Sequence, residues 1–167
     1  MAEQRVCEQH ELESILARAE YMSMAMCGED GTPYLIPVNF GHEPGMVYVH
    51  CSRKGRKLDI LRKNPKVCLN VVLTKGLGFK RDGSMACQYS MDFDSVIMEG
   101  TAEILEDEAL RGHAMDVLLD QYGLGKNGKN LAVSSSVMQK TAMLRIRVHS
   151  VSLKQNRLDA FAGKESL

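Results

Sequence analysis

Basic residues gather in one short stretch of the sequence, from Arg53 to Lys63, where six lysines or arginines accompany a single acid, Asp59. Four of the six flank Gly55 in the run SRKGRK, directly before an apolar pattern that predicts a helix. Free backbone amides at a helix start attract anions, and glycine lets an anion approach the backbone closely. Arginine can grip a phosphate with two parallel hydrogen bonds, and lysine adds a point charge. The stretch therefore predicts a site for a terminal phosphate, with a solvated helix face as the alternative.

His50 stands just before these basic residues, at the end of an alternating apolar run. Imidazole changes charge near neutral pH, so His50 is a candidate for proton transfer if the basic cluster belongs to an active site. A structural histidine is the alternative, because histidines are often partly buried. Haem needs one axial histidine, which leaves His50 and His149 open as haem ligands. The cysteines and histidines show no compact ligand spacing, so no metal site is predicted.

The composition sets limits on the class of protein. A length of 167 residues fits one domain, residues 1–167, which can bury a core without disulfides or metal. The 21 basic and 21 acidic residues balance, which argues against a general attraction to nucleic acid or to a membrane surface. Five cysteines without a C-x-x-C pair, and no secretory leader, favour free thiols in the cytoplasm. No apolar run reaches the roughly 18 residues of a membrane span.

The first half of the chain is predicted to form one helix and three short strands. The helix covers residues 8–20, where four apolar side chains make one stripe. An antiparallel meander is expected from strands at 21–27, 34–40 and 46–51, joined by turns at 28–33 and 41–45. Pro37 lies inside the second strand and predicts an edge position or a bulge.

The second half is predicted to form longer strands and a longer helix. The expected elements are a short helix at 57–63, strands at 66–73, 95–105 and 143–153, a helix at about 106–122, and loops between them, including 74–86 and the SSS run. Gly100 predicts a bulge or a barrel corner in the middle strand. The G-x-G-x-x-G pattern from Gly123 follows a helix, so it is interpreted as a helix end and loop. About six strands and three helices predict a mainly β fold with peripheral helices, a small antiparallel barrel.

Three segments together resemble a known family. They are PYLIPVNFGHEPGMVYVHCSRKGRKLDILRKNPKVCLNVV, SVIMEGTAEILEDEALRGHAMDVLLDQY and, more weakly, TAMLRIRVHSVSLKQN. The sequence resembles the FMN-binding split-barrel proteins related to pyridoxamine phosphate oxidase, and among them the nitroimidazole-resistance branch. The resemblance runs from about Tyr21 to Asn156 and implies a six-stranded split β-barrel that forms a homodimer and binds FMN at the subunit interface.

The resemblance also implies a role for individual residues. The ring of FMN would be lined by Pro37, Val38, Asn39 and Phe40, whose extended backbone could offer hydrogen bonds. The phosphate would be held by Arg56 and Lys57, with Gly55 permitting its approach. His50 and Cys51 would lie beside the flavin, with His50 on the substrate side, and Ser95 would come close to the cofactor.

Two departures from the family pattern narrow the expected activity. The chain has no tryptophan, and residues 152–167 lack the family's C-terminal pattern, which argues against pyridoxamine phosphate oxidase activity. Leu153 and Lys154 stand where the resistance branch often has Gly-Lys. The leading hypothesis is an FMN-dependent oxidoreductase of the nitroimidazole reductase-like type, acting on a small aromatic or nitro-bearing substrate. The alternatives are a non-catalytic flavin- or haem-binding split barrel and a relative that uses a deazaflavin.

Overall fold

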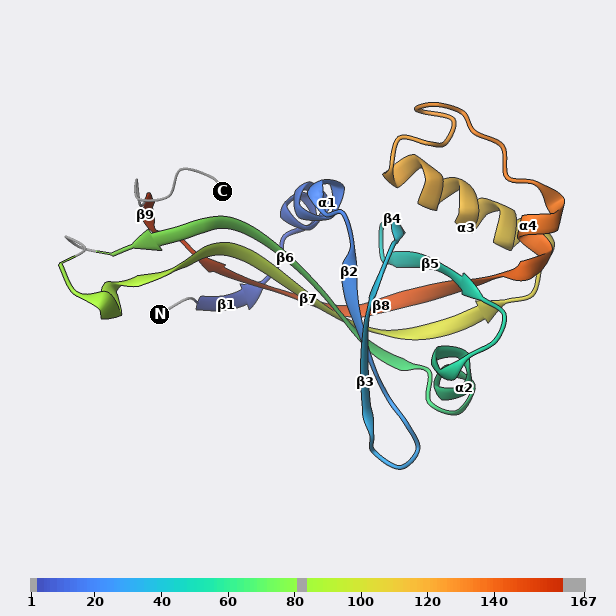
Figure 1. Cartoon of the computed structure of the whole chain (residues 1–167), viewed down its shortest axis with the longest axis horizontal. Coiled ribbons are helices and arrows are strands. Elements are labelled where there is room, and N and C mark those ends of the chain that lie inside the picture. Colours follow the sequence, from blue (N-terminus) through green and yellow to red (C-terminus); the bar gives the residue numbers. More distant parts are fainter. Residues whose placement is uncertain (1–2, 81–83, 161–167) are drawn as a thin grey trace.

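The computed structural model describes residues 3–80 and 84–160, whose strands form one antiparallel sheet (Figure 1). The strand order is β3-β2-β6-β7-β8-β5-β4, while β1 pairs with β8 and β9 pairs with β6. The bounds are β1 Glu3–Val6, β2 Met22–Cys27, β3 Pro33–Val38, β4 Gly41–Glu43, β5 Met46–Ser52, β6 Lys66–Phe79, β7 Tyr89–Leu105, β8 Thr141–Asn156 and β9 Asp159–Ala160. Six of these match the six predicted strands, and β1, β4 and β9 are short additions. The predicted class, a mainly β split barrel with peripheral helices, is confirmed.

The predicted meander of the first three strands is wrong in its second half. β2 pairs with β3 as expected, but β5 pairs with β8, and residues 41–45 contain β4 instead of a turn alone. Pairing with β8 places Val47 opposite Ile146, and both side chains are buried. This apolar match lies about a hundred residues away in the sequence, so local spacing could not indicate it. The strands β3 and β4 end the sheet order, and Pro37 therefore lies on an edge strand, as predicted.

The strands β6 and β7 are longer than the sequence predicted. Residues 74–79, expected as part of a loop, continue β6 and pair with β7 after a bulge between Thr74 and Gly76. Residues 81–83 of that expected loop lie outside the described residues. Figure 1 shows the β6–β7 hairpin extending away from the barrel toward β9. The bulge predicted at Gly100 is confirmed by a register shift between Glu99 and Gly100.

The helices lie at the periphery and begin at recognisable caps. Their bounds are α1 Gln9–Arg18, α2 Arg56–Lys63, α3 Glu108–Gln121 and α4 Ser135–Lys140, with a 3-10 turn at Ala86–Gln88. At α3, the Asp107 carboxylate accepts the backbone N–H of Leu110 at 2.9 Å. The serine run expected to be a loop instead supplies the N-cap Ser134 of α4. Among the described residues, no helix is long and apolar enough to cross a membrane.

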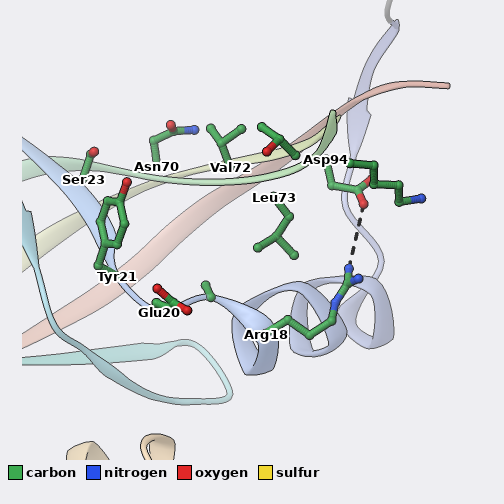
Figure 2. Close-up of a pocket in the computed structure, with 11 residues that line it drawn as sticks. Arg18, Glu20, Tyr21, Ser23, Asn70, Val72, Leu73 and Asp94 are labelled. Carbon is green, nitrogen blue, oxygen red and sulfur yellow. Dashed lines mark ion pairs between the residues drawn. The ribbon is translucent and has the colours of Figure 1, made fainter. Parts of the chain in front are cut away.

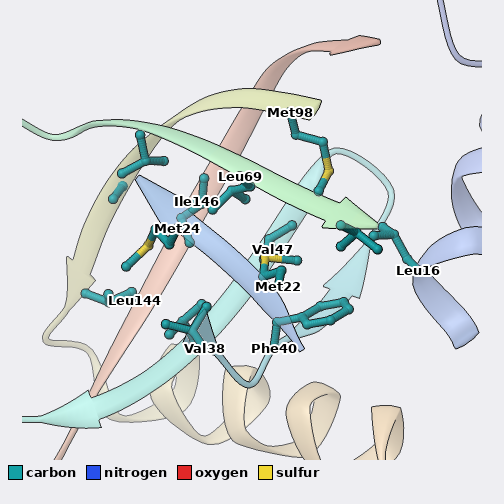
Figure 3. Close-up of a cluster of buried hydrophobic side chains, with 14 of the residues drawn as sticks. Leu16, Met22, Met24, Val38, Phe40, Val47, Leu69, Met98, Leu144 and Ile146 are labelled. Atoms are coloured by element: carbon teal, nitrogen blue, oxygen red, sulfur yellow. The ribbon is translucent and has the colours of Figure 1, made fainter. Parts of the chain in front are cut away.

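The core fills the inside of the barrel and the space beneath α1 (Figure 3). Met22, Met24 and Met26 alternate inward on β2, as the sequence predicted. They meet Val38 and Phe40 from the β3 side and residues of β5, β6, β7 and β8. Burying one such side chain stabilises a fold by roughly 1.5–3 kcal/mol, so this inward face largely determines the register of the sheet.

Candidate flavin site

The β5–α2 junction, residues Arg53–Lys57, connects a strand of the barrel to a helix. Gly55 is the N-cap of α2 and adopts a φ of 124°, a region that other residues rarely occupy. The Gly55 carbonyl accepts the N–H of Leu58 at 3.0 Å, so the amides of Arg56 and Lys57 precede the helical ladder. A Cβ placed on Gly55 would meet nothing within 4 Å. The junction is therefore open, with backbone donors beside basic side chains.

The structure divides the six predicted basic residues by their partners. Four of them contact other residues. Arg62 pairs with Asp59 at 3.3 Å, and Lys63 pairs with Glu29 at 2.6 Å. Arg53 donates to the Gln139 carbonyl at 2.9 Å, and the Arg56 guanidinium lies 4.6 Å from the centre of the Tyr34 ring. Among the described residues, Lys54 and Lys57 have no ion-pair partner. The solvated helix face explains Arg62 and Lys63, and Lys57 is a basic side chain that remains available for an anion.

Lys57 acts on the two residues that the sequence placed beside the flavin. The pKa of His50 is lowered because neighbouring protein atoms remove part of its hydration and because Lys57 adds positive charge. Desolvation raises the pKa of the Cys51 thiol, and Lys57 offsets part of that rise. His50 is exposed and lies opposite Met143 on β8. The structure therefore brings Lys57, His50 and Cys51 into one electrostatic environment.

Residues 37–40 comprise the last two residues of β3 and the two residues before β4, and their side chains alternate between solvent and core. Val38 and Phe40 are buried, whereas Pro37 and Asn39 are exposed. Any contact of Val38 or Phe40 with a ligand would therefore involve their backbone. Arg56 stacks on Tyr34 of the same strand, so the start of α2 lies against β3. This contact joins the phosphate-binding junction to β3 at Tyr34, three residues before the predicted ring-lining segment begins.

Ser95 lies elsewhere on the sheet. About ten residues of β7, roughly 33 Å of strand, separate it from Leu105, which shares its row with Met143 and His50. The Ser95 hydroxyl accepts a hydrogen bond from the Asn70 amide at 3.1 Å. The register places Asn70 opposite Ser23, and Ser23 opposite Pro37. Ser95 therefore shares the outer face of the sheet with Pro37, and the structure does not bring it to His50.

A pocket of about 410 Å³ lies between α1 and β6, and Ser23 and Asn70 are among the residues that line it (Figure 2). Figure 2 shows Arg18 reaching from α1 toward Asp94 on β7, where their atoms lie 3.8 Å apart. Burial acts to raise the pKa of Asp94, but hydrogen bonds from Arg157 and Gln155 outweigh it and lower that pKa. No sequence motif indicates this pocket, because its residues come from separate elements.

His149, the second candidate haem ligand, lies in a different pocket of about 580 Å³ with Cys27 and Cys68. One of its ring nitrogens lies 2.8 Å from the Thr101 hydroxyl. No group of three or more metal-ligating side chains occurs within residues 3–80 and 84–160. All five cysteines are unpaired, as the sequence predicted.

The curled antiparallel sheet and its open β5–α2 junction define a split barrel of the pyridoxamine phosphate oxidase-like class. Residues 8–155 match the family model described as pyridoxamine 5'-phosphate oxidase, and the chain belongs to that family. The resemblance inferred from the sequence is confirmed.

Solved structures give the same result. The chain is 25% identical to a "putative 5-nitroimidazole antibiotic resistance protein" from Bacteroides thetaiotaomicron, with a TM-score of 0.76 over 92% of this chain and 88% of that one. It is 26% identical to the flavocytochrome Anf3 from Azotobacter vinelandii, with a TM-score of 0.77 over 93% of this chain and 70% of that one. An FAD and heme binding protein from Mycobacterium smegmatis shares the fold, at 23% identity and a TM-score of 0.79 over 95% and 76%.

A curated relative matches a shorter segment. An uncharacterized protein from Rhizobium meliloti is 33% identical over 67 residues, which is 40% of this chain. The match spans 43% of that relative, less than half its length.

Proposed function

We propose that this protein binds FMN and is an oxidoreductase of the nitroimidazole reductase-like type. The observation that carries the proposal is the open β5–α2 junction, where Lys57 has no ion-pair partner among the described residues and influences both His50 and Cys51. The junction fits a phosphate dianion, because Gly55 leaves space and the first amides of α2 and the Lys57 ammonium are donors. The similarity to a protein described in terms of nitroimidazole resistance supports the substrate class.

FMN, when bound, supplies the electron-transfer chemistry, and the protein supplies binding and orientation. Arg56, Lys57 and the first α2 amides would hold the phosphate, and the Arg56 guanidinium, 4.6 Å from the centre of the Tyr34 ring, lies at the start of the helix that presents these amides. The backbone of residues 37–40 lines the ring. Desolvation and the Lys57 charge lower the pKa of His50 and so favour its neutral form, which would donate one ring N–H to a substrate oxygen.

We also propose that the outer face of the sheet forms a homodimer. This face carries Pro37 and Ser95 together with exposed apolar side chains: Leu35 at 64% exposure, Val72 at 49% and Ile97 at 37%. Ser23 and Asn70 lie between them on the same face, and exposed apolar side chains mixed with polar ones in this way are typical of protein interfaces. A second copy on this face would cover these side chains and add its own surface beside the flavin.

The dimer proposal is tested with Ile97→Glu, measured by light scattering after gel filtration. A charge in the interface should yield monomers and weaken FMN binding. Leu110→Glu is the matched control, because Leu110 is similarly exposed, at 40%, but lies on α3. A dimer that survives Ile97→Glu would overturn the proposed interface.

The activity itself is tested under anaerobic conditions. FMN-loaded protein is reduced, mixed with a nitroimidazole, and followed by the return of oxidised-flavin absorbance. Reoxidation faster than that of free reduced FMN supports the proposal, and reoxidation at the same rate as the free cofactor contradicts it.

Haem binding is the second candidate function. Two neighbours of the same fold are described as a flavocytochrome and as an FAD and heme binding protein. His50 is exposed, and His149 lines a pocket, so each could present a ring nitrogen to iron. Adding haem to the purified protein and recording the Soret band separates this candidate from a pure flavoprotein.

A further inference from the structure

Tyr122 lies at the end of α3 and binds three groups from two other segments. Its hydroxyl oxygen accepts the Phe40 backbone N–H at 3.1 Å and the Asn39 side-chain amide at 3.3 Å. The same hydroxyl donates its proton to the Glu20 carbonyl at 2.9 Å. A phenol has one proton and two lone pairs, so these bonds satisfy it completely.

The end of α3 is itself fixed in place. Gly123 follows Tyr122 with a φ of 65°, and its N–H donates to the Asp120 carbonyl, which ends the helix. The neighbouring Gln121 donates to the Leu16 carbonyl at 2.9 Å and contacts His42 through its amide oxygen at 2.9 Å. The helix end therefore ties the link between β3 and β4 to the end of α1.

The backbone around Phe40 has little freedom to move. Phe40 is fully buried. A Cβ on Gly41 would lie 2.7 Å from backbone atoms of Leu118 on α3, which is closer than real contacts allow. The chain therefore passes directly against α3, and the Tyr122 hydroxyl fixes the peptide just before this crossing.

Tyr122 also determines which way the Asn39 amide points. The Glu20 carbonyl can only accept, so the phenol proton is directed to it and Asn39 must contribute its NH₂ group. This assignment leaves the Asn39 Oδ1 on the other side of the amide. Among the described residues, no donor binds that oxygen. An exposed acceptor thus lies in the segment assigned to the flavin ring.

We propose that Tyr122 is a positioning residue. It orients the side-chain oxygen Oδ1 of Asn39 and the backbone of residues 37–40 so that they can bind a heteroaromatic ligand with a ring N–H. The ligand class is that of the flavin ring, so this inference rests on the proposed function. Within the part of the chain that the structure describes, the Tyr122 hydroxyl bonds to Asn39, Phe40 and Glu20 and not to the phosphate-binding junction or His50. Its effect on binding passes through Asn39 and Phe40.

The test compares Tyr122→Phe with Tyr48→Phe, whose hydroxyl instead donates to Glu43 at 2.9 Å. Hydrogen exchange of the Phe40 amide should become about tenfold faster in Tyr122→Phe, because its acceptor is lost. FMN binding, followed by quenching of flavin fluorescence, should weaken about tenfold, and the bound flavin spectrum should shift. Tyr48→Phe should leave the Phe40 amide and FMN binding unchanged.

A double-mutant cycle with Asn39→Ala separates positioning from general stability. In the Asn39→Ala background, Tyr122→Phe should weaken FMN binding by only about twofold to threefold, since part of its target is gone. Fully additive effects, or a Tyr122→Phe variant that loses stability but binds FMN normally, would overturn the inference. If the wild-type protein takes up no FMN, the proposed function fails and this inference fails with it. Normal wild-type binding with an unaffected variant overturns the inference alone.

Discussion

The β5–α2 junction and the Asp94 region of β7 differ in how their charges are used. At the junction, Lys57 is a cation without an ion-pair partner among the described residues, beside an exposed His50. Around Asp94, a buried carboxylate is surrounded by Arg157, Gln155 and Arg18. Removing a partner of a buried, hydrogen-bonded charge destabilises the fold, whereas an exposed charge without a partner is available to a ligand. The comparison assigns stability to the Asp94 region and binding to the junction.

The largest effect is expected from Asp94→Asn, which should lower the free energy of unfolding by about 3 kcal/mol, because the buried carboxylate loses the charge that strengthens its hydrogen bonds from Arg157 and Gln155. Urea denaturation at pH 7 measures it. The exposed pair between Glu103 and Arg145 is the control, and Glu103→Gln should cost less than about 1 kcal/mol.

The loss of stability in Asp94→Asn should depend on pH. The pKa of folded Asp94 is lowered, so its contribution is present above the unfolded value of about 3.9 and is lost as the pH falls through the folded pKa. The stability difference between wild type and Asp94→Asn should therefore shrink below about pH 4. An equal difference at pH 7 and pH 2 would assign the effect to packing instead of charge.

His50→Ala should leave FMN bound and slow the oxidation of reduced flavin by a nitroimidazole by about 100-fold, the size expected when one hydrogen-bond donor to a developing negative charge is removed. Stopped-flow absorbance measures the rate. His149→Ala is the matched control and should react normally, because His149 lies six residues along β8 from Met143, the strand partner of His50. Equal rates for wild type and His50→Ala would remove His50 from the reaction.

Lys57→Ala should weaken FMN binding by about 30-fold, as expected for one charge-assisted hydrogen bond, and should change stability by less than about 0.5 kcal/mol. Fluorescence titration and urea denaturation measure the two effects. Lys54→Ala removes the same charge on the other side of Gly55 and should weaken binding by only about threefold. Similar losses in both variants would mean that the junction attracts anions without a defined contact.

The smallest expected effect is a change in the pKa of His50. Lys57 contributes to the lowered pKa of His50, so Lys57→Ala should raise that pKa. NMR titration of the His50 ring protons checks the direction. An unchanged midpoint would show that desolvation alone lowers the pKa.

The sequence predicted those features whose physical cause is local. Gly55, between two pairs of basic residues, indicated the open start of α2. Pro37 indicated an edge strand or a bulge, and Gly100 indicated a bulge. It could not predict the pairing of β5 with β8, which depends on matching apolar faces across distant segments. Asp94 and Tyr122 were missed for the same reason, because their partners are distant in the chain. A tyrosine directly before a helix-ending glycine was the available signal, and it does not indicate what the phenol binds.

The most direct test of the account is to compare FMN with riboflavin, which lacks the phosphate, as ligands of the wild-type protein. The β5–α2 junction as a phosphate site predicts FMN binding tighter than riboflavin binding by about 100-fold, with the preference falling to a few-fold in Lys57→Ala. Equal affinity for the two flavins, or no uptake of either, would contradict the assignment of this junction to the flavin phosphate.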